Sequence, residues 1–185
     1  DEIHAGLILD QDKKHIATGN IPDAADILVT LQSASKTFNM PGLGCAYAVV
    51  KNPVLRKKIK QIMNGIVHHV GALGFTATLA AYQNGKAWHS ELIEYLRLNR
   101  EQVEQTLSPC DGLTVYHSEA TYLTWIDARK MPVNNPSLYF EKFGVGLYDG
   151  APFGAPGFLR LNYACPNSIL QEALKRIKSG LAELI

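Results

Sequence analysis

The sequence predicts an α/β fold followed by a small α+β domain, and three features support this prediction. Two compact apolar runs of strand length, 26–31 (DILVTL) and 45–50 (CAYAVV), are separated by a longer connection, as in a layered α/β structure. A long helical pattern occupies residues 86–107. After it, short segments follow one another in the order strand, strand, helix, strand, helix.

The composition is that of an ordinary globular protein. The chain has 185 residues, of which 46% are hydrophobic and 19% are charged, and its net charge is +1. This near-neutral balance argues against non-specific binding to nucleic acid or to an anionic membrane. No apolar run reaches the roughly 18 residues of a membrane span. We therefore expect a small molecule or a second copy of the chain as the partner.

The cysteines indicate a reducing compartment. Cys45, Cys110 and Cys165 are widely scattered and lack the spacing of a zinc site or a disulfide framework. We expect reduced thiols packed as small apolar side chains, in a cytoplasmic protein. His68 and His69 have no third ligand at helical spacing, so the sequence predicts no metal site.

Helical patterns follow the second apolar run. Asn52 is suited to cap a helix that begins at Pro53, and apolar residues recur at helical spacing as far as Met63. The basic residues among them fit the solvated face of an amphipathic helix better than an anion site. A second helix, rich in alanine, is expected over 71–84.

The helical pattern at 86–107 marks the expected domain boundary. At 1.5 Å per residue such a helix reaches about 30 Å, long enough to pass from one domain into the next. We predict a first domain over residues 1–87 and a second over 88–185. In the second, strands are expected at 113–117, 122–127 and 158–164, with helices at 137–143 and from 166 onward.

Lys36 has the strongest claim to chemistry. It lies in the stretch 33–44 (SASKTFNMPGLG), after a predicted buried strand, among hydroxyl-bearing residues and ahead of a glycine-rich turn. A lysine held away from bulk water can act as a Schiff-base nucleophile. The neighbouring hydroxyls and turn amides could receive phosphate oxygens. From the residues alone, an incidental loop lysine is the alternative.

This stretch resembles the cofactor-lysine motif of pyridoxal-phosphate enzymes of the aspartate-aminotransferase fold. The closest form is SKTFN-x-x-G, found in the cystathionine β-lyase/C–S lyase branch. Further segments resemble the same branch in the same order: DEIH at 1–4, AAYQNGKAWHSELIEYLRLNR at 80–100, SEATYLTWIDAR at 118–129 and GAPGFLRLNYACP at 154–166.

The resemblance covers essentially the whole chain but corresponds to the C-terminal half of such an enzyme. It implies that the first domain is the C-terminal part of the large cofactor-binding domain, with a mostly parallel sheet and helices. The second would be the small α+β C-terminal domain, including the bridging helix.

The resemblance also implies roles for individual residues. Lys36 would be the catalytic residue, forming the Schiff base with pyridoxal 5'-phosphate and later moving the proton at the substrate Cα. Asp1 would keep the pyridine nitrogen protonated, which makes the ring an electron sink. His4 stands where many relatives place a tyrosine that bonds the 3-oxygen of the ring. A partly buried histidine without that bond is the alternative.

The phosphate of the cofactor is expected near Ser33 and Ser35. Ser33, three residues before the lysine, matches a phosphate-contacting hydroxyl, and Ser35 is a second candidate. In many aminotransferases an arginine eight residues after the lysine binds the phosphate. Gly44 stands there in this chain, in agreement with the C–S lyase branch, so phosphate binding falls to residues outside the chain.

Arg160 lies in an apolar strand pattern, between Leu159 and Leu161. An unpaired buried guanidinium is costly, so this residue needs a counter-charge. Either a structural carboxylate or the α-carboxylate of a substrate would serve. The resemblance favours the substrate.

The resemblance implies a C–S β-lyase that cleaves cystathionine or related S-substituted cysteines to a thiol, pyruvate and ammonia. An aminotransferase with the same residues is the alternative, because the fate of the carbanion depends on fine geometry. A third hypothesis is an inactive structural fragment, because the chain opens at Asp1 without a methionine and lacks the N-terminal half of the fold. The complete enzyme is expected to be a homodimer.

Overall fold

The computed structural model of the chain describes residues 1–22 and 24–184. Its mixture of helices and short strands confirms the α/β class. The chain divides into two compact units, Asp1–Leu92 and Ile93–Ile185, and the division falls within helix α3 (Lys86–Leu107). The sequence places its domain boundary slightly earlier, at residue 87. Among the described residues, no helix combines the length and the apolar character that a membrane span requires.

The sheet of unit 1 differs from the prediction. Strand β1 (Thr30–Gln32) pairs with β2 (Tyr47–Val49), and the pair is antiparallel, whereas the resemblance implies a mostly parallel sheet for the large domain. Parallel neighbours need a long crossover, usually a helix. The connection 33–46 contains only tight turns and the short 3-10 helix η2 (Pro41–Leu43), so the chain simply reverses direction.

Strand β2 also differs in its environment. The apolar run 45–50 predicts a strand buried on both faces, but Tyr47, Ala48 and Val49 are all exposed. That prediction is wrong for the described chain, because apolar composition does not supply the layers that would cover the strand. Among the described residues of unit 1, Leu7 and Leu9, in the segment that precedes the sheet, are 0% exposed.

The helices of unit 1 confirm the predicted pattern. Besides the short 3-10 helix η1 (Thr18–Asn20), they are α1 (Pro53–Met63), α2 (Ala72–Asn84) and the first part of α3. Oδ1 of Asn52 accepts hydrogen bonds from the amides of residues 54 and 55, at 2.9 and 3.2 Å, which confirms Asn52 as the cap of α1.

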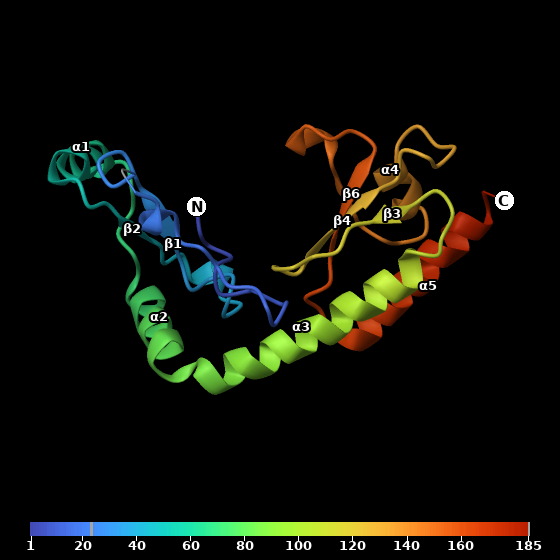
Figure 1. Cartoon of the computed structure of the whole chain (residues 1–185), viewed down its shortest axis with the longest axis horizontal. Helices are drawn as coiled ribbons and strands as arrows, with labels where there is room; N and C mark the ends of the chain where they lie inside the picture. The colour runs from blue at the N-terminus through green and yellow to red at the C-terminus, as the bar shows by residue number, and fades with distance from the viewer. Residues whose placement is uncertain (23, 185) are drawn as a thin grey trace. The chain divides into compact units, whose positions relative to one another are not determined.

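Unit 2 combines helices with a small antiparallel sheet. Its four-stranded antiparallel sheet has the order β3–β4–β6–β5, and one face is covered by α5 and the C-terminal part of α3, which run side by side in the same direction (Figure 1). Its elements are β3 (Thr114–Val115), β4 (Leu123–Asp127), α4 (Pro136–Glu141), β5 (Tyr148–Asp149), η3 (Ala151–Phe153), β6 (Phe158–Asn162) and α5 (Asn167–Ala182). Strand β5 lies in a region for which the sequence predicts no strand.

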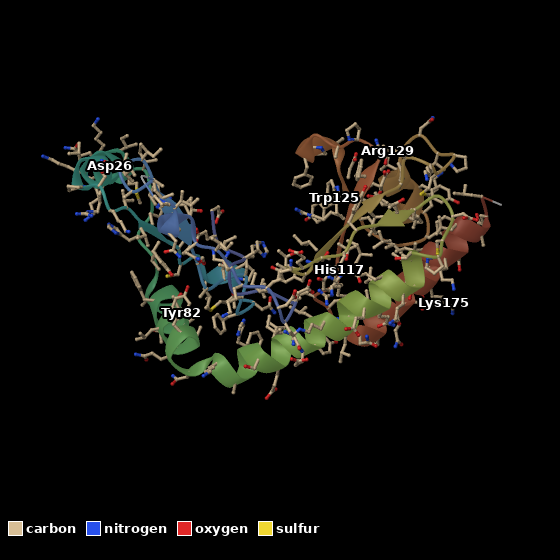
Figure 2. The ribbon with its side chains drawn as sticks, viewed as in Figure 1. Asp26, Tyr82, His117, Trp125, Arg129 and Lys175 are labelled. Carbon is tan, nitrogen blue, oxygen red and sulfur yellow. The ribbon has the colours of Figure 1, made fainter. Side chains whose placement is uncertain are left out.

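Alternation along the two central strands separates a core face from an open face. Thr124 and Ile126 of β4, and Leu159 and Leu161 of β6, are buried. Their neighbours point to the opposite face because successive side chains of a strand alternate. Trp125 on β4 and Arg129 just beyond it are labelled in Figure 2, with Lys175 on α5 for reference.

A buried amide fastens α3 to the end of β6. Nδ2 of Asn99 donates to the carbonyl oxygens of Tyr163 and Cys165, at 2.9 and 3.2 Å. Its Oδ1 accepts from Nδ2 of Asn167 at 3.0 Å. Asn99 is 1% exposed, and these three bonds satisfy an amide that would otherwise be costly to bury.

Candidate active site

The opening segment of the chain lies against the Lys36 turn. The amide of Glu2 donates to the carbonyl oxygen of Leu31 at 2.9 Å, which places residues 1 and 2 beside β1. A Cβ at Gly6 would lie 2.7 Å from Oγ1 of Thr37, so only glycine allows the two segments to approach this closely. The structure therefore brings the DEIH and SASK segments together.

Lys36 lies in a tight turn directly after β1. The amide of Phe38 donates to the carbonyl oxygen of Ala34, and that of Met40 donates to the carbonyl oxygen of Ser35, both at 2.9 Å. The side chain of Lys36 is partly buried and makes no hydrogen bond or ion pair with any described residue. The amine is therefore not committed to a structural role within the described chain.

Aromatic packing anchors this turn. The ring of Phe38 stacks on Trp88, with centroids 5.9 Å apart, and meets Tyr82 edge to face at 6.1 Å. The Nε2 atom of His89 lies 2.6 Å from the carbonyl oxygen of Gly6. The α2–α3 junction thus holds both the turn that carries Lys36 and the segment that carries His4.

Only one of the two carboxylate oxygens of Asp1 accepts a hydrogen bond from a described residue. The amide of Ile3 donates to its Oδ1 at 3.0 Å, while Oδ2 has no hydrogen bond to a described residue, and the residue is exposed. The next residue, Glu2, accepts from the amide of Thr18 at 2.7 Å and lies 3.1 Å from His15. These contacts lower the pKa of Glu2, with the Thr18 bond as the main cause. His4 is partly buried.

The two serines before Lys36 have different positions. Oγ of Ser33 donates its proton to the carbonyl oxygen of Cys45 at 2.7 Å and accepts from the amide of Ser35 at 3.0 Å. A hydroxyl has one proton, so in this conformation Ser33 cannot donate to a further acceptor. The Ser35 hydroxyl makes no hydrogen bond to a described residue and is partly exposed.

A pocket of about 290 Å³ lies beside this turn, and its lining includes Gly6, Ser33 and Thr37. On its other side, the hydroxyls of Tyr47 and Tyr82 are 3.4 Å apart. Burial raises the pKa of Tyr82, and the hydrogen bond to Tyr47 raises it further. The hydroxyl of Tyr82 therefore remains protonated at physiological pH.

Arg160 in unit 2 has aromatic neighbours in place of a counter-charge. In register it faces Trp125 of β4 on one side and Tyr148 of β5 on the other. Its Cζ lies 4.6 Å from the ring centroids of both Tyr148 and Phe153. Its Nε is buried without a hydrogen bond, and no carboxylate of the described residues forms an ion pair with it.

Arg129 provides a contrast in the same unit. Its Nε and Nη2 donate to the two carboxylate oxygens of Asp127, at 3.0 and 2.7 Å, while its Cζ lies 4.7 Å from the ring centroid of Phe158. The hydrogen bonds from Arg129 lower the pKa of Asp127. Arg129 is therefore neutralised by a structural carboxylate, whereas Arg160 is not.

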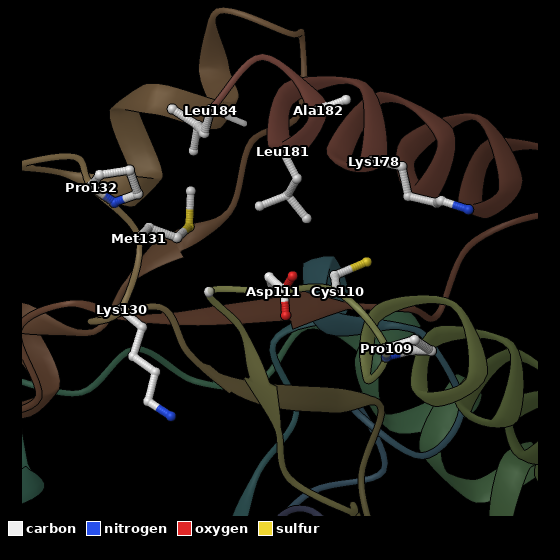
Figure 3. A pocket seen from close by; sticks show the side chains of 11 residues that line it. Pro109, Cys110, Asp111, Lys130, Met131, Pro132, Lys178, Leu181, Ala182 and Leu184 are labelled. Carbon is white, nitrogen blue, oxygen red and sulfur yellow. The ribbon is translucent and has the colours of Figure 1, made fainter.

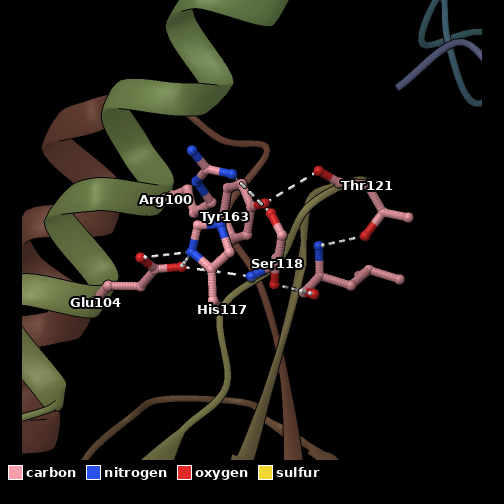
Figure 4. Close-up of polar contacts among 7 residues, drawn as sticks. Arg100, Glu104, His117, Ser118, Thr121 and Tyr163 are labelled. Carbon is pink, nitrogen blue, oxygen red and sulfur yellow. Dashed lines mark hydrogen bonds and ion pairs between the residues drawn. The ribbon is translucent and has the colours of Figure 1, made fainter. Parts of the chain in front are cut away.

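A polar network orders the connection between β3 and β4 (Figure 4). Glu104 of α3 lies 3.0 Å from Nδ1 of His117, and Nη1 of Arg100 donates to the carbonyl oxygen of Ser118 at 2.8 Å. The hydroxyl of Tyr163 donates to the carbonyl oxygen of Thr121, at 3.0 Å. The sequence predicts no such network, although the stretch 118–129 that resembles the C–S lyase branch begins at Ser118.

A separate pocket of about 360 Å³ lies at the far end of unit 2, where the C-terminal turn of α5 approaches the loops at 109–112 and 130–132 (Figure 3). Met131 and Leu181 give it an apolar floor, and Lys130 and Lys178 flank it. Its lining includes no residue that the sequence assigned to catalysis or binding. The predicted residues of unit 1 gather around the Lys36 turn, and Arg160 lies on the open face of the unit 2 sheet.

The chain belongs to the aminotransferase class I and II family, whose model matches residues 1–177. The resemblance carried by the motifs is thereby confirmed. Among its relatives, cystathionine beta-lyase PatB of Bacillus subtilis (strain 168) is 34% identical, over 98% of this chain and 49% of that protein. The probable aspartate/prephenate aminotransferase of Aquifex aeolicus (strain VF5) is 28% identical, over 94% of this chain and 46% of that protein.

Solved structures agree with this assignment. The crystal structure of OvoB matches with a TM-score of 0.95 and 40% identity, over 98% of this chain and 48% of that chain. The crystal structure of cystalysin from Treponema denticola, which contains a pyridoxal 5'-phosphate cofactor, matches with a TM-score of 0.91 and 28% identity, over 100% of this chain and 49% of that chain. The chain thus spans about half the length of the curated relatives it matches.

Proposed function

We propose that the chain is the C-terminal half of a pyridoxal-phosphate-dependent C–S β-lyase acting on cystathionine or related S-substituted cysteines. The products would be a thiol, pyruvate and ammonia. Unit 1 would be the C-terminal part of the large cofactor-binding domain, and unit 2 the small C-terminal domain. The observation that carries the proposal is the uncommitted amine of Lys36, in a turn packed against the segment that bears Asp1.

The groups around Lys36 fit the cofactor. A Schiff base needs an amine without a structural partner, and Lys36 has none among the described residues. The pyridine nitrogen needs a carboxylate, and Oδ2 of Asp1 is available. The phosphate needs donors, which the Ser35 hydroxyl can supply at once, and Ser33 after it turns away from the Cys45 carbonyl. His4 would face the 3-oxygen of the ring.

In the proposed reaction, Lys36 takes the proton from Cα of the substrate amino acid. When bound, pyridoxal phosphate supplies the electron sink that stabilises the negative charge left on Cα. Asp1 holds the proton on the pyridine nitrogen, because a neighbouring carboxylate favours the cationic form of that nitrogen. The leaving group is the thiolate on Cβ.

Arg160 binds the α-carboxylate of the substrate in this proposal. A guanidinium donates two parallel hydrogen bonds to a carboxylate, which fixes orientation as well as charge. The absence of an ion pair to Arg160 among the described residues supports this role over a structural one.

An aminotransferase is the second candidate, supported by the aminotransferases among the relatives. The full-length protein should be incubated with cystathionine, and pyruvate measured with and without an added keto acid. The lyase releases pyruvate with no keto acid present. Strict dependence on a keto acid would instead assign the protein as an aminotransferase.

The 185 residues by themselves are expected to be inactive and to bind the cofactor weakly. The exposed strand β2 supports this expectation, because the apolar residues Tyr47 and Val49 lack a covering layer. We further propose that the full-length enzyme is a homodimer and that it is cytoplasmic. The cytoplasmic location is consistent with three cysteines that form no disulfide. Cofactor absorbance that survives dialysis of the 185-residue chain, and is lost with Lys36→Ala, would overturn the inactive-fragment hypothesis.

A further inference from the structure

The guanidinium of Arg160 lies against two aromatic rings. Its Cζ is 4.6 Å from the centroid of Tyr148 and 4.6 Å from that of Phe153. Aromatic faces attract a guanidinium through the ring quadrupole, and the planar group stacks on them without a counter-ion. We call Tyr148 and Phe153 the aromatic bracket.

Each ring is placed by its own piece of backbone. Tyr148 faces Arg160 across the β5–β6 ladder. Phe153 is held by the turn after β5. In this turn the amide of Gly150 donates to the carbonyl oxygen of Phe158 at 2.8 Å, and the amide of Phe153 donates to the carbonyl oxygen of Gly150 at 2.9 Å.

Glycine at position 150 is needed for this turn. A Cβ there would lie 2.9 Å from both Cβ and the carbonyl oxygen of Phe158, so the turn and β6 could not approach as closely. In addition, Oδ1 of Asp149 accepts from the amide of Ala151 at 2.9 Å. The position of Phe153 is therefore set by the backbone, although its ring is 54% exposed.

We propose that Tyr148 and Phe153 are positioning residues for carboxylate recognition by Arg160, an inference that rests on the proposed function of this residue. The bracket holds the guanidinium plane without supplying an anion that would compete with the ligand. Because Nε is buried, the terminal nitrogens Nη1 and Nη2 are the donors that a carboxylate reaches. The ligand therefore binds in the guanidinium plane, at its outer edge.

Arg129 shows why a bracket of rings matters. It contacts the ring of Phe158, but its Nε and Nη2 already donate to both carboxylate oxygens of Asp127. An arginine positioned by a carboxylate is neutralised, whereas one positioned by rings keeps its charge and its outer donors. Unit 2 thus contains one arginine paired with a structural carboxylate, Arg129, and one whose outer donors can bind a ligand carboxylate, Arg160.

The experiment is an NMR titration of the full-length protein with sodium acetate, observing the arginine Nε–H resonances at constant ionic strength. Arg160→Lys identifies the Arg160 signal. The test variants are Tyr148→Leu and Phe153→Leu, the ring-retaining controls are Tyr148→Phe and Phe153→Tyr, and Tyr116→Leu changes an exposed aromatic residue outside the bracket.

The bracket predicts a ring-current shift of the Arg160 Nε–H signal that weakens in both leucine variants and persists in all three controls. It also predicts that each leucine variant weakens acetate binding about fivefold, the size expected for one partly exposed cation–π contact. Acetate affinity and ring-current shift equal to the wild type in both leucine variants would overturn the bracket. If the chemical shift of the Arg160 signal does not change with acetate in the wild type, the proposed carboxylate role would be overturned. The ring-current comparison would still test the bracket in that case. Amide spectra of each variant show whether unit 2 remains folded.

Discussion

Replacing Asn99 by alanine is expected to destabilise unit 2 by about 3 kcal/mol. The substitution removes three hydrogen bonds, to Tyr163, Cys165 and Asn167, and each contributes about 1 kcal/mol net. Water should not replace these bonds at the Asn99 position, because Asn99 is 1% exposed. The end of β6, which carries Arg160, would be loosened with it.

Urea unfolding followed by Trp125 fluorescence measures this effect. The chain has two tryptophans, so a Trp88→Phe background leaves a reporter in unit 2 alone. With a urea dependence of about 1.5 kcal/mol per molar, the midpoint should fall by about 2 M. Asn134→Ala, at an exposed asparagine, is the matched control and should shift the midpoint by less than about 0.4 M. Equal midpoints for the two variants would refute the account of the buried amide.

Two further predictions concern pH and the serines. Asp127 has a lowered pKa in the folded state, so its contribution to stability is present above the ordinary value of 3.8 and is lost as the pH falls through the folded-state pKa. Asp127→Asn should therefore flatten the acid limb of the stability curve of unit 2, and an unchanged limb would contradict the ion pair with Arg129. Ser33→Ala should lower the stability of unit 1 by about 1 to 2 kcal/mol, because the hydrogen bond to the carbonyl oxygen of Cys45 is lost. It should also lower the cofactor affinity of the full-length protein, because the proposed phosphate-contacting hydroxyl is removed. Ser35→Ala should lower cofactor affinity without lowering stability. A loss of stability in urea unfolding for Ser35→Ala but not for Ser33→Ala would contradict these assignments.

Local signals predicted the helices well. The Asn52 cap and the pattern at 86–107 depend on neighbouring residues, so they could be read without knowledge of the tertiary structure. The role of the buried Asn99 could not be predicted in this way, because its side chain donates to the carbonyl oxygen of Tyr163, more than sixty residues away in the chain.

The sheets were harder to predict because strand pairing and burial depend on distant segments. The apolar run at 45–50 predicts a strand buried on both faces, yet β2 is exposed and pairs with β1 at a sheet edge. Strand β5 has only two residues, too few to give a periodic signal. Edge pairing and covering layers are tertiary properties that a local pattern does not contain.

The candidate site shows the same division. The motifs identified Lys36 and Arg160 as candidate site residues, but the contacts of their side chains can be seen only in the structure. Only the structure shows that the proton of Ser33 is donated to Cys45, and that Arg160 is held by rings. Tyr148 and Phe153 have no signal in the sequence that would separate them from ordinary core aromatics.

The most direct test of the central claim is to find which lysine binds the cofactor. The full-length protein that contains this chain should be treated with pyridoxal 5'-phosphate, reduced with borohydride, digested and mapped by mass spectrometry. The account predicts a stable cofactor adduct on the peptide with Lys36, which disappears in Lys36→Ala and persists in Lys51→Ala, a change at an exposed lysine. An adduct on a different lysine in the wild type, with Lys36 unmodified, would contradict the account.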